Sequence, residues 1–304
     1  METQSLFITC HLKGGLGNQL FQIFNALRNA IKHNGKIVFT NATLLDNNCR
    51  STYWSNLLDA LQKYTMSIHY SDFKSVIREK GFEYKSLDAD VLSIKTNDNS
   101  QNQKILFDGY FQSPKYFEDM YPTIYHFLQI AEKQEMVRTK LVNMNVDLTN
   151  TVSMHFRLGD YKKLPNHHPV LKKEYYNDAL KHISLHSPNK ITHVLYFYED
   201  NEDAKEVEKT IHLLKEQFPD IHFTSILSLS STNTLVDWEQ ILAMSCCTHH
   251  VIANSTFSWW GAYLSNFANN SNKIICYPSI WFGPALKHHD TKDLFPDQWT
   301  KIKI

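Results

Sequence analysis

The sequence predicts an α/β protein of two domains, each built on a parallel sheet. Three observations support this prediction. Residues 5–40 alternate strand, helix and strand, a new strand begins near residue 151, and strands alternate with helices from there to residue 278. Because parallel strands are joined by crossover helices, this alternation is typical of parallel sheets. We therefore expect a first domain over residues 1–150 and a second over residues 151–304.

In the first half, a strand over residues 5–12 leads through a glycine-rich turn into a helix that an Asn-Gly pair ends before the strand at 36–40. The apolar residues that recur at helical spacing in this helix are Leu20, Phe21, Phe24, Leu27 and Ile31. Residues 71–120 mix short strands and loops, and residues 117–145 predict a helix with a break at Pro122.

The second half repeats the alternation of strand and helix. The predicted strands cover residues 151–156, 191–198, 221–226, 248–253 and 273–278. The predicted helices cover residues 175–186, 201–218, 235–247 and 255–267. The strand at 273–278 is the last that the pattern indicates.

Charge and cysteine content exclude several classes of protein. The 31 basic residues equal the 31 acidic ones, so no overall positive field attracts nucleic acid or an anionic membrane. Five irregularly spaced cysteines argue against a disulfide framework. The chain begins with no basic segment followed by an apolar one, and no apolar run approaches about 18 residues. We expect a cytoplasmic protein without an integral membrane segment.

The turn "KGGLGNQ" at residues 13–19 resembles a dinucleotide-binding loop without matching it. Leu20 stands where the third glycine of that motif belongs, and no acid follows the next strand, which excludes a nicotinamide or flavin cofactor. Two interpretations stay open: a turn that only lets strand and helix pack, or a helix N-terminus that faces a ligand. Asn18 beside the turn favours the second, with Gly15 giving close approach.

Polar residues lie at or just after the ends of three strands of the second half. They are His155 and Arg157, then Glu199 and Asp200, then Asn254, Ser255, Thr256 and Ser258. The carboxyl ends of parallel strands share one edge of a sheet, so these residues form a candidate nucleoside-diphosphate site. The arginine and the amides take phosphates, and Asp200 or Glu199 takes donor groups of the base or ribose. The alternatives are helix caps and an ion pair between Arg157 and Asp160.

No credible metal site appears in the sequence. The only Asp-x-Asp, residues 88–90, does not follow an apolar strand, and the paired histidines at 167, 249 and 288 lack ligands at chelating spacing. We therefore expect neither a metal nor any other cofactor.

The segments "GGLGNQLFQ", "GYFQSPKYF", "HFRLGDY", "HPVLKKEYYNDAL" and "ANSTFSWWGAYL" occur in this order. With them the chain resembles the α-1,2-fucosyltransferases of glycosyltransferase family 11, nearly end to end. The resemblance implies a GT-B type fold, in which two Rossmann-like domains with parallel sheets face a cleft. It also implies metal-independent, inverting transfer of L-fucose from GDP-fucose to the 2-hydroxyl of a galactose-containing acceptor. The first domain would serve the acceptor and the second GDP-fucose.

The resemblance assigns Arg157 to the phosphates, where it would stabilise the leaving GDP. Inversion also needs a base that takes the acceptor proton, and His168 and Asp160 are the two candidates. The alternatives are that Asp160 orients Arg157 and that His168 only lines the acceptor cleft. Acceptor contacts are expected from Tyr110, Gln112 and Trp259, since sugar faces pack on rings.

One residue departs from the family pattern His-x-Arg-Arg-Gly-Asp, because Leu158 stands at the second arginine. An arginine at 158 would either reach the phosphates or be forced into apolar surroundings. We expect the first outcome, so that Leu158→Arg leaves the fold intact and modestly raises turnover or the affinity for GDP. Two other functions stay open: a nucleotide-sugar-binding relative without turnover, and a transferase with another donor or linkage.

Overall fold

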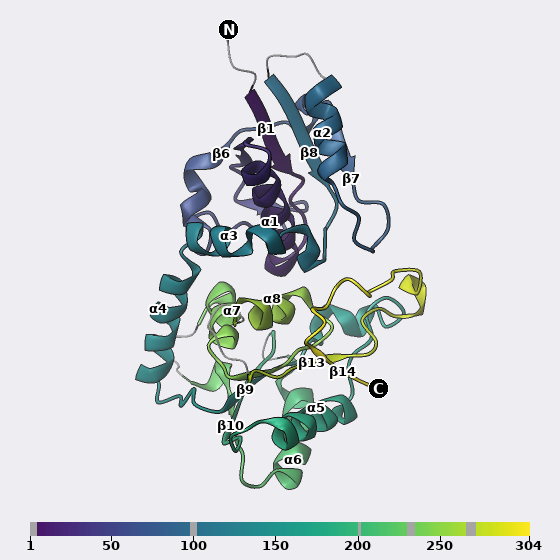
Figure 1. Cartoon of the computed structure of the whole chain (residues 1–304). Helices are drawn as coiled ribbons and strands as arrows, with labels where there is room; N and C mark the ends of the chain where they lie inside the picture. Colours follow the sequence, from purple (N-terminus) through teal and green to yellow (C-terminus); the bar gives the residue numbers. More distant parts are fainter. Residues whose placement is uncertain (1–4, 98–101, 200–201, 230–234, 266–271) are drawn as a thin grey trace. The chain divides into compact units, whose positions relative to one another are not determined.

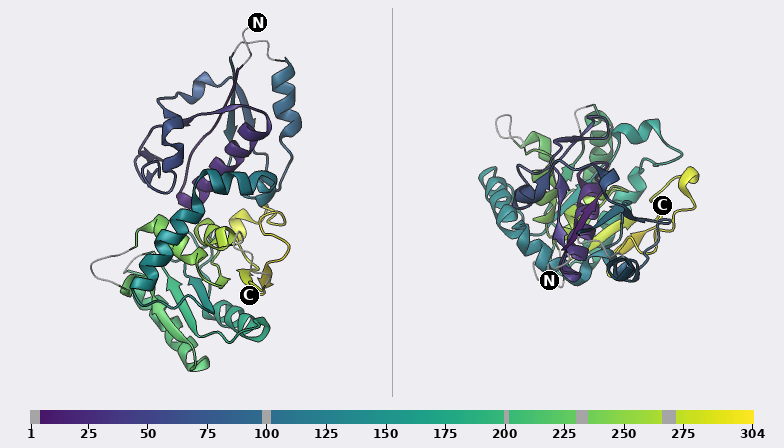
Figure 2. Two further views of the ribbon diagram at one scale, coloured as in Figure 1. Left: turned by 60° about the vertical axis from the view of Figure 1, so that its left-hand side comes forward. Right: turned by 90° about the horizontal axis from the view of Figure 1, so that it is seen from above.

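The computed structural model describes residues 5–97, 102–199, 202–229, 235–265 and 272–304, and the chain forms two compact units (Figures 1 and 2). Unit 1 comprises Met1–Ala131 and His289–Pro296, and unit 2 comprises Glu132–His288 and Asp297–Ile304. The main sheet of each unit contains only parallel pairs, as the sequence predicted.

The units divide after Ala131, earlier than the predicted boundary at residue 150. The reason is helix α4 (Ile130–Asn143), which packs on unit 2. On this helix Gln134 Nε2 donates to Ser245 Oγ at 2.6 Å.

A late segment, His289–Pro296, returns to unit 1. Asp293 ties it there, because its carboxylate accepts from Tyr84 N at 3.1 Å and pairs with Lys115 Nζ at 2.6 Å. Ser113 Oγ also donates to the Asp293 carbonyl at 2.5 Å.

Unit 1 has a four-stranded sheet in the order β2-β1-β8-β7. Its strands are β1 (Ser5–Cys10), β2 (Lys36–Ile37), β3 (Phe39–Thr40), β4 (Leu44–Leu45), β5 (Arg50–Ser51), β6 (Thr65–Met66), β7 (Ser75–Arg78) and β8 (Asn102–Asp108). Its helices are α1 (Leu16–Lys32), α2 (Asp88–Asn97) and α3 (Tyr121–Phe127). In Figure 1, α2 lies beside β8.

Two details of unit 1 differ from the sequence prediction. Helix α2 occupies a region predicted as strands and loops, and its Asp88 pairs with Arg28 Nη1 at 2.5 Å and Lys32 Nζ at 2.7 Å. The helix predicted over 117–145 breaks at Gln129, where φ is +55°, and not at Pro122. Pro122 lies in the first turn of α3, where its missing N–H costs no helical hydrogen bond.

Unit 2 has a six-stranded sheet in the order β11-β10-β9-β12-β13-β14. Its strands are β9 (Thr151–His155), β10 (His193–Phe197), β11 (His222–Ser225), β12 (His249–Val251), β13 (Ile275–Pro278) and β14 (Thr300–Ile302). Besides α4, its helices are α5 (Lys173–His186), α6 (Ala204–Gln217), α7 (Asp237–Ser245) and α8 (Thr256–Leu264). Helices α5 and α6 lie on one side of the sheet and α7 and α8 on the other (Figure 1). Strand β14 was not predicted.

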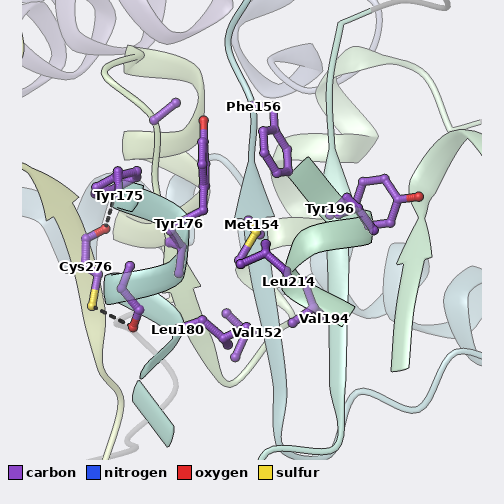
Figure 3. Close-up of a cluster of buried hydrophobic side chains, with 14 of the residues drawn as sticks. Val152, Met154, Phe156, Tyr175, Tyr176, Leu180, Val194, Tyr196, Leu214 and Cys276 are labelled. Atoms are coloured by element: carbon purple, nitrogen blue, oxygen red, sulfur yellow. Dashed lines mark hydrogen bonds between the residues drawn. The ribbon is translucent and has the colours of Figure 1, made fainter. Parts of the chain in front are cut away.

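The core of unit 2 forms where α5 packs on the sheet. Figure 3 shows Met154 of β9 and Tyr176 of α5 within this cluster. Tyr175 is fully buried, and its hydroxyl donates to the carbonyl of Ile252 at 2.5 Å, which satisfies the polar group inside the core. Leu158, only 4% exposed, belongs to the same cluster.

All five cysteines are free thiols, as expected for a chain without a disulfide framework. Across the described residues, no helix combines the length and the apolar character that crossing a bilayer requires.

Candidate active site

Arg157 lies in the turn that follows β9, near the middle of the unit 2 sheet. Its Nη1 donates to Glu199 Oε2 and its Nη2 to Asp160 Oδ1, both at 2.5 Å. The guanidinium carbon lies 5.0 Å from the centroid of the Tyr161 ring, and 18% of the side chain is exposed. The ion pair with Asp160 that the sequence left open is therefore present. It fixes the orientation of an arginine that is still partly open to solvent.

Gly159 makes this arrangement possible. Its φ is +38°, and a Cβ added there would lie 2.6 Å from Glu199 Oε2. The Gly159 N–H donates to Asp203 Oδ2 at 2.8 Å, and the other oxygen of this buried carboxylate pairs with Lys162 Nζ at 2.7 Å. A larger residue at 159 would push Glu199 away from Arg157.

Two buried polar atoms beside this turn have no hydrogen-bond partner within the described residues. They are Nδ1 of His155, at the end of β9, and Oδ1 of Asn254, which follows the neighbouring strand β12. Burial and the positive charge of Arg157 lower the pKa of His155 to about 3, so this ring is neutral at physiological pH. Buried polar groups are normally satisfied, so these two atoms point to a bound ligand or ordered water.

The start of α8 is used partly by the fold itself. Ser255 Oγ caps the helix by accepting from Phe257 N at 3.3 Å. Ser258 is 1% exposed, and its Oγ accepts from Ala253 N at 3.2 Å. The Ser258 hydroxyl closes the turn between β12 and α8. The prediction that Ser258 contacts GDP-fucose is therefore wrong. Thr256, half-buried at the first position of α8, remains a candidate.

The two predicted bases, His168 and Asp160, both lie near Arg157 in this part of unit 2. The His168 ring stacks on Tyr161 with centroids 4.6 Å apart, and the Tyr161 hydroxyl donates to the Asn254 carbonyl at 3.0 Å. Burial lowers the pKa of His168 although the charge of Asp160 acts to raise it. The structure thus joins His168 and Asn254 to Arg157 through the Tyr161 side chain, and it joins Asp160 to Arg157 directly.

Asp200 lies outside the described residues. Glu199, the alternative to it, follows β10 and is one of the two carboxylates paired with Arg157. It therefore orients the arginine.

In unit 1 the predicted residues also meet at the carboxyl end of the sheet. Asn18 Oδ1 accepts a hydrogen bond from Gln112 Nε2 at 2.9 Å. A residue predicted to bind GDP-fucose and one predicted to bind the acceptor sugar therefore touch each other. A Cβ at Gly15 would meet no atom within 4 Å, whereas Gly14 has a φ of +78° and a Cβ there would lie 2.5 Å from Asn18 Nδ2. Packing does not require glycine at 15, which favours the interpretation that a ligand approaches this helix start.

Tyr110 is 37% exposed, and Lys13 Nζ lies 5.1 Å from the centroid of its ring. The same edge of the sheet carries two residues that the sequence analysis missed. His11 directly follows β1, and Asp108 ends β8. Their positions at strand ends were the signal that could have found them.

Trp259 is not an acceptor contact. Its side chain is 0% exposed, its ring stacks on Tyr263 with centroids 4.6 Å apart, and the Trp299 ring lies 5.5 Å away. A sugar needs an exposed ring face, so the burial of this indole in the unit 2 core corrects the prediction.

Possible metal ligands do not gather in the part of the chain that the structure describes. There, no three side chains of His, Cys, Asp or Glu are placed to hold an ion. The Asp-x-Asp at residues 88–90 lies in the first turn of α2, where Asp88 is paired with Arg28 and Lys32.

Sequence relatives of the chain are glycosyltransferases. It is 26% identical to the alpha-1,2-colitosyltransferase of Escherichia coli over 322 residues, which cover 97% of this chain and 99% of that protein. It is 27% identical to a galactoside 2-alpha-L-fucosyltransferase of Caenorhabditis elegans over 305 residues, which cover 97% of this chain and 79% of that protein.

Among solved structures, POFUT1 in complex with GDP-fucose matches with a TM-score of 0.54 at 11% identity, covering 90% of this chain and 98% of that chain. At this identity the match shows the fold, and it confirms the predicted GT-B type. The model of glycosyl transferase family 11 matches residues 1–303. Because that match spans nearly the whole sequence, the chain belongs to glycosyl transferase family 11.

Proposed function

We propose that this glycosyltransferase moves L-fucose from GDP-fucose to the 2-hydroxyl of a terminal β-galactoside, with inversion at the transferred carbon. The observation that carries the proposal is the Arg157 guanidinium, held at the carboxyl end of the unit 2 sheet beside two unsatisfied buried atoms. The names of its relatives, a 2-alpha-L-fucosyltransferase among them, support the chemistry.

The donor side of the proposal rests on charge. Asp160 and Glu199 are exposed, at 47% and 41% of their side chains, so a diphosphate can replace either carboxylate on Arg157 with little structural change. Arginine binds phosphate oxygens through two parallel N–H donors, which suits this exchange.

The reaction itself is a single displacement. The acceptor oxygen forms a bond to C1 of fucose as the bond from C1 to the diphosphate oxygen breaks, and the bonding electrons leave with GDP. Negative charge therefore grows on the diphosphate, where Arg157 stabilises it. We assign the acceptor to unit 1, where the exposed Tyr110 ring offers a sugar a stacking face. Gln112 is buried there, and its amide donates to Asn18.

A donor screen followed by linkage analysis tests the proposal. Purified protein is given GDP-fucose, other GDP-sugars and UDP-sugars with a panel of galactosides, and the products are analysed for the new linkage. We expect an α-1,2-linked fucoside. GDP-fucose binding without transfer to any acceptor would instead indicate a nucleotide-sugar-binding relative without turnover. Transfer only from a UDP-sugar would show that GDP-fucose is not the donor.

Colitose is the second candidate sugar, because one relative is an alpha-1,2-colitosyltransferase that matches 97% of this chain. Fucose and colitose differ by one hydroxyl, so competition between GDP-fucose and GDP-colitose in one reaction separates the two possibilities. The preferred donor is the one with the higher kcat/KM.

We also predict that transfer needs no divalent cation, since Arg157 supplies the positive charge on the leaving diphosphate. Enzyme treated with a chelator and then freed of it should keep its full rate, and added Mg²⁺ or Mn²⁺ should not raise that rate. Loss of turnover on chelation, restored by Mn²⁺, would show that the prediction is wrong.

A further inference from the structure

The carboxyl end of the unit 1 sheet carries a histidine–carboxylate pair. His11 Nδ1 lies 3.4 Å from Asp108 Oδ1, and 43% of the histidine side chain is exposed. The two residues follow or end neighbouring parallel strands, β1 and β8. Ligands of open α/β sheets bind outside such strand ends.

The surroundings of the pair hold both side chains in place. The His11 ring lies against the Tyr70 ring, with centroids 4.6 Å apart. Lys13 Nζ lies 3.3 Å from Asp108 Oδ1, and Arg78 Nε lies 3.5 Å from Asp108 Oδ2.

The charges of these neighbours also determine the protonation state of Asp108. Burial acts to raise the pKa of Asp108, but hydrogen bonds and charges from Lys13 and His11 lower it overall. Asp108 is therefore ionised at neutral pH. An ionised carboxylate accepts the proton of His11 Nδ1, so Nε2 is left as the basic nitrogen of the neutral ring.

A surface suited to a sugar lies beside this pair. Tyr110, two residues after Asp108, is 37% exposed, and the ammonium of Lys13 lies 5.1 Å from its ring centroid. An exposed ring provides an apolar face and a lysine provides a hydrogen-bond donor, which together fit a hydroxylated ring such as galactose.

The two bases expected in unit 2 are less suited to proton uptake. Asp160 accepts the hydrogen bond that holds Arg157. His168 is stacked on Tyr161, and burial lowers its pKa. By contrast, His11 combines an orienting carboxylate with an exposed ring, which is the arrangement that general bases require.

We propose that His11 is the base that takes the proton from the acceptor hydroxyl, and that Asp108 is its positioning residue. This inference rests on the proposed transfer reaction. As the acceptor oxygen bonds to C1 of fucose, its proton passes to His11 Nε2, and GDP leaves with the electrons of the broken bond. The proton is later released to water.

The test compares His11→Gln with His126→Gln, a change of an exposed histidine on α3 of the same unit. We expect His11→Gln to lower kcat on the order of 10²- to 10³-fold, with the affinity for GDP unchanged. His126→Gln should match the natural enzyme. Added imidazole should restore part of the turnover of His11→Ala, since a small base can replace the missing ring.

Asp108→Asn provides a second readout. A carboxylate beside the ring stabilises its protonated form, and its removal leaves the positive charges of Lys13 and Arg78 uncompensated. The acid limb of the kcat/KM profile should therefore move to lower pH. A purely structural role would lower the rate without moving this limb.

The outcomes separate this inference from the proposed function. If the natural protein transfers sugar and His11→Gln is as active as His126→Gln, the inference is wrong and the transferase assignment stands. If the natural protein transfers no sugar from any donor, both are wrong. A third outcome combines two results: imidazole does not restore the lost activity of His11→Ala, and the pH profile of Asp108→Asn does not move. That outcome would assign the pair a structural role alone.

Discussion

Arg157→Ala is expected to lower kcat on the order of 10²- to 10³-fold, the usual loss when one donor to a transition-state anion is removed. The guanidinium contacts the Asp160 and Glu199 carboxylates and the Tyr161 ring, and none of these three side chains carries a positive charge. Its removal leaves two carboxylates where the diphosphate develops negative charge. Steady-state kinetics at saturating donor would measure the loss.

Arg157→Lys and Arg138→Ala are the matched variants. Lysine keeps the charge but cannot hold two carboxylates through a planar fork, so an intermediate rate is expected. Arg138 pairs with Glu135 on the surface of α4, at 3.5 Å, and its loss should leave kcat unchanged. A rate for Arg157→Ala within a few-fold of the natural enzyme would show that Arg157 serves the turn and not the chemistry.

Leu158→Arg is expected to destabilise unit 2 by about 2–4 kcal/mol, because it buries a charge without a partner. This reverses the expectation drawn from the sequence, in which an arginine at 158 reached the phosphates. The leucine side chain is 4% exposed and belongs to the core cluster of α5 and the sheet, on the inner side of the turn. Denaturant unfolding of the purified variant measures the effect.

Leu158→Met is the control for this substitution. Methionine keeps the volume and the apolar character, so the expected loss is less than about 1.5 kcal/mol. If Leu158→Arg is as stable as Leu158→Met and also binds GDP more tightly, the side chain has turned toward the nucleotide and the original expectation holds.

Much of the unit 2 site could be predicted from sequence because strand ends in a parallel sheet share an edge. His155, Arg157 and Asn254 follow neighbouring strands, and a pattern of apolar runs is enough to place them together. Which side chains of this edge face the core was harder to predict. Ser258 and Trp259 both lie in a short polar-aromatic segment, and only packing shows that they face inward.

Other features depended on contacts between distant segments. Helix α2 has no clear apolar face, and its first turn is stabilised by Arg28 and Lys32 of α1. Strand β14 has only three residues, which pair with residues 276–278 of β13. Such short elements are stabilised by contacts with segments distant in the sequence, and local hydrophobic periodicity does not reveal those contacts.

The return of His289–Pro296 to unit 1 bears on protein engineering. A single cut after Ala131 would leave the first unit without Asp293 and thus without the salt link to Lys115 and the bond from Ser113. A chimaera that combines the first unit of one family member with the second unit of another therefore needs three junctions, one near residue 131 and one on each side of residues 289–296. With those junctions, each unit keeps all the segments that belong to it. Under the proposed division of roles, acceptor choice would then be exchanged independently of donor choice.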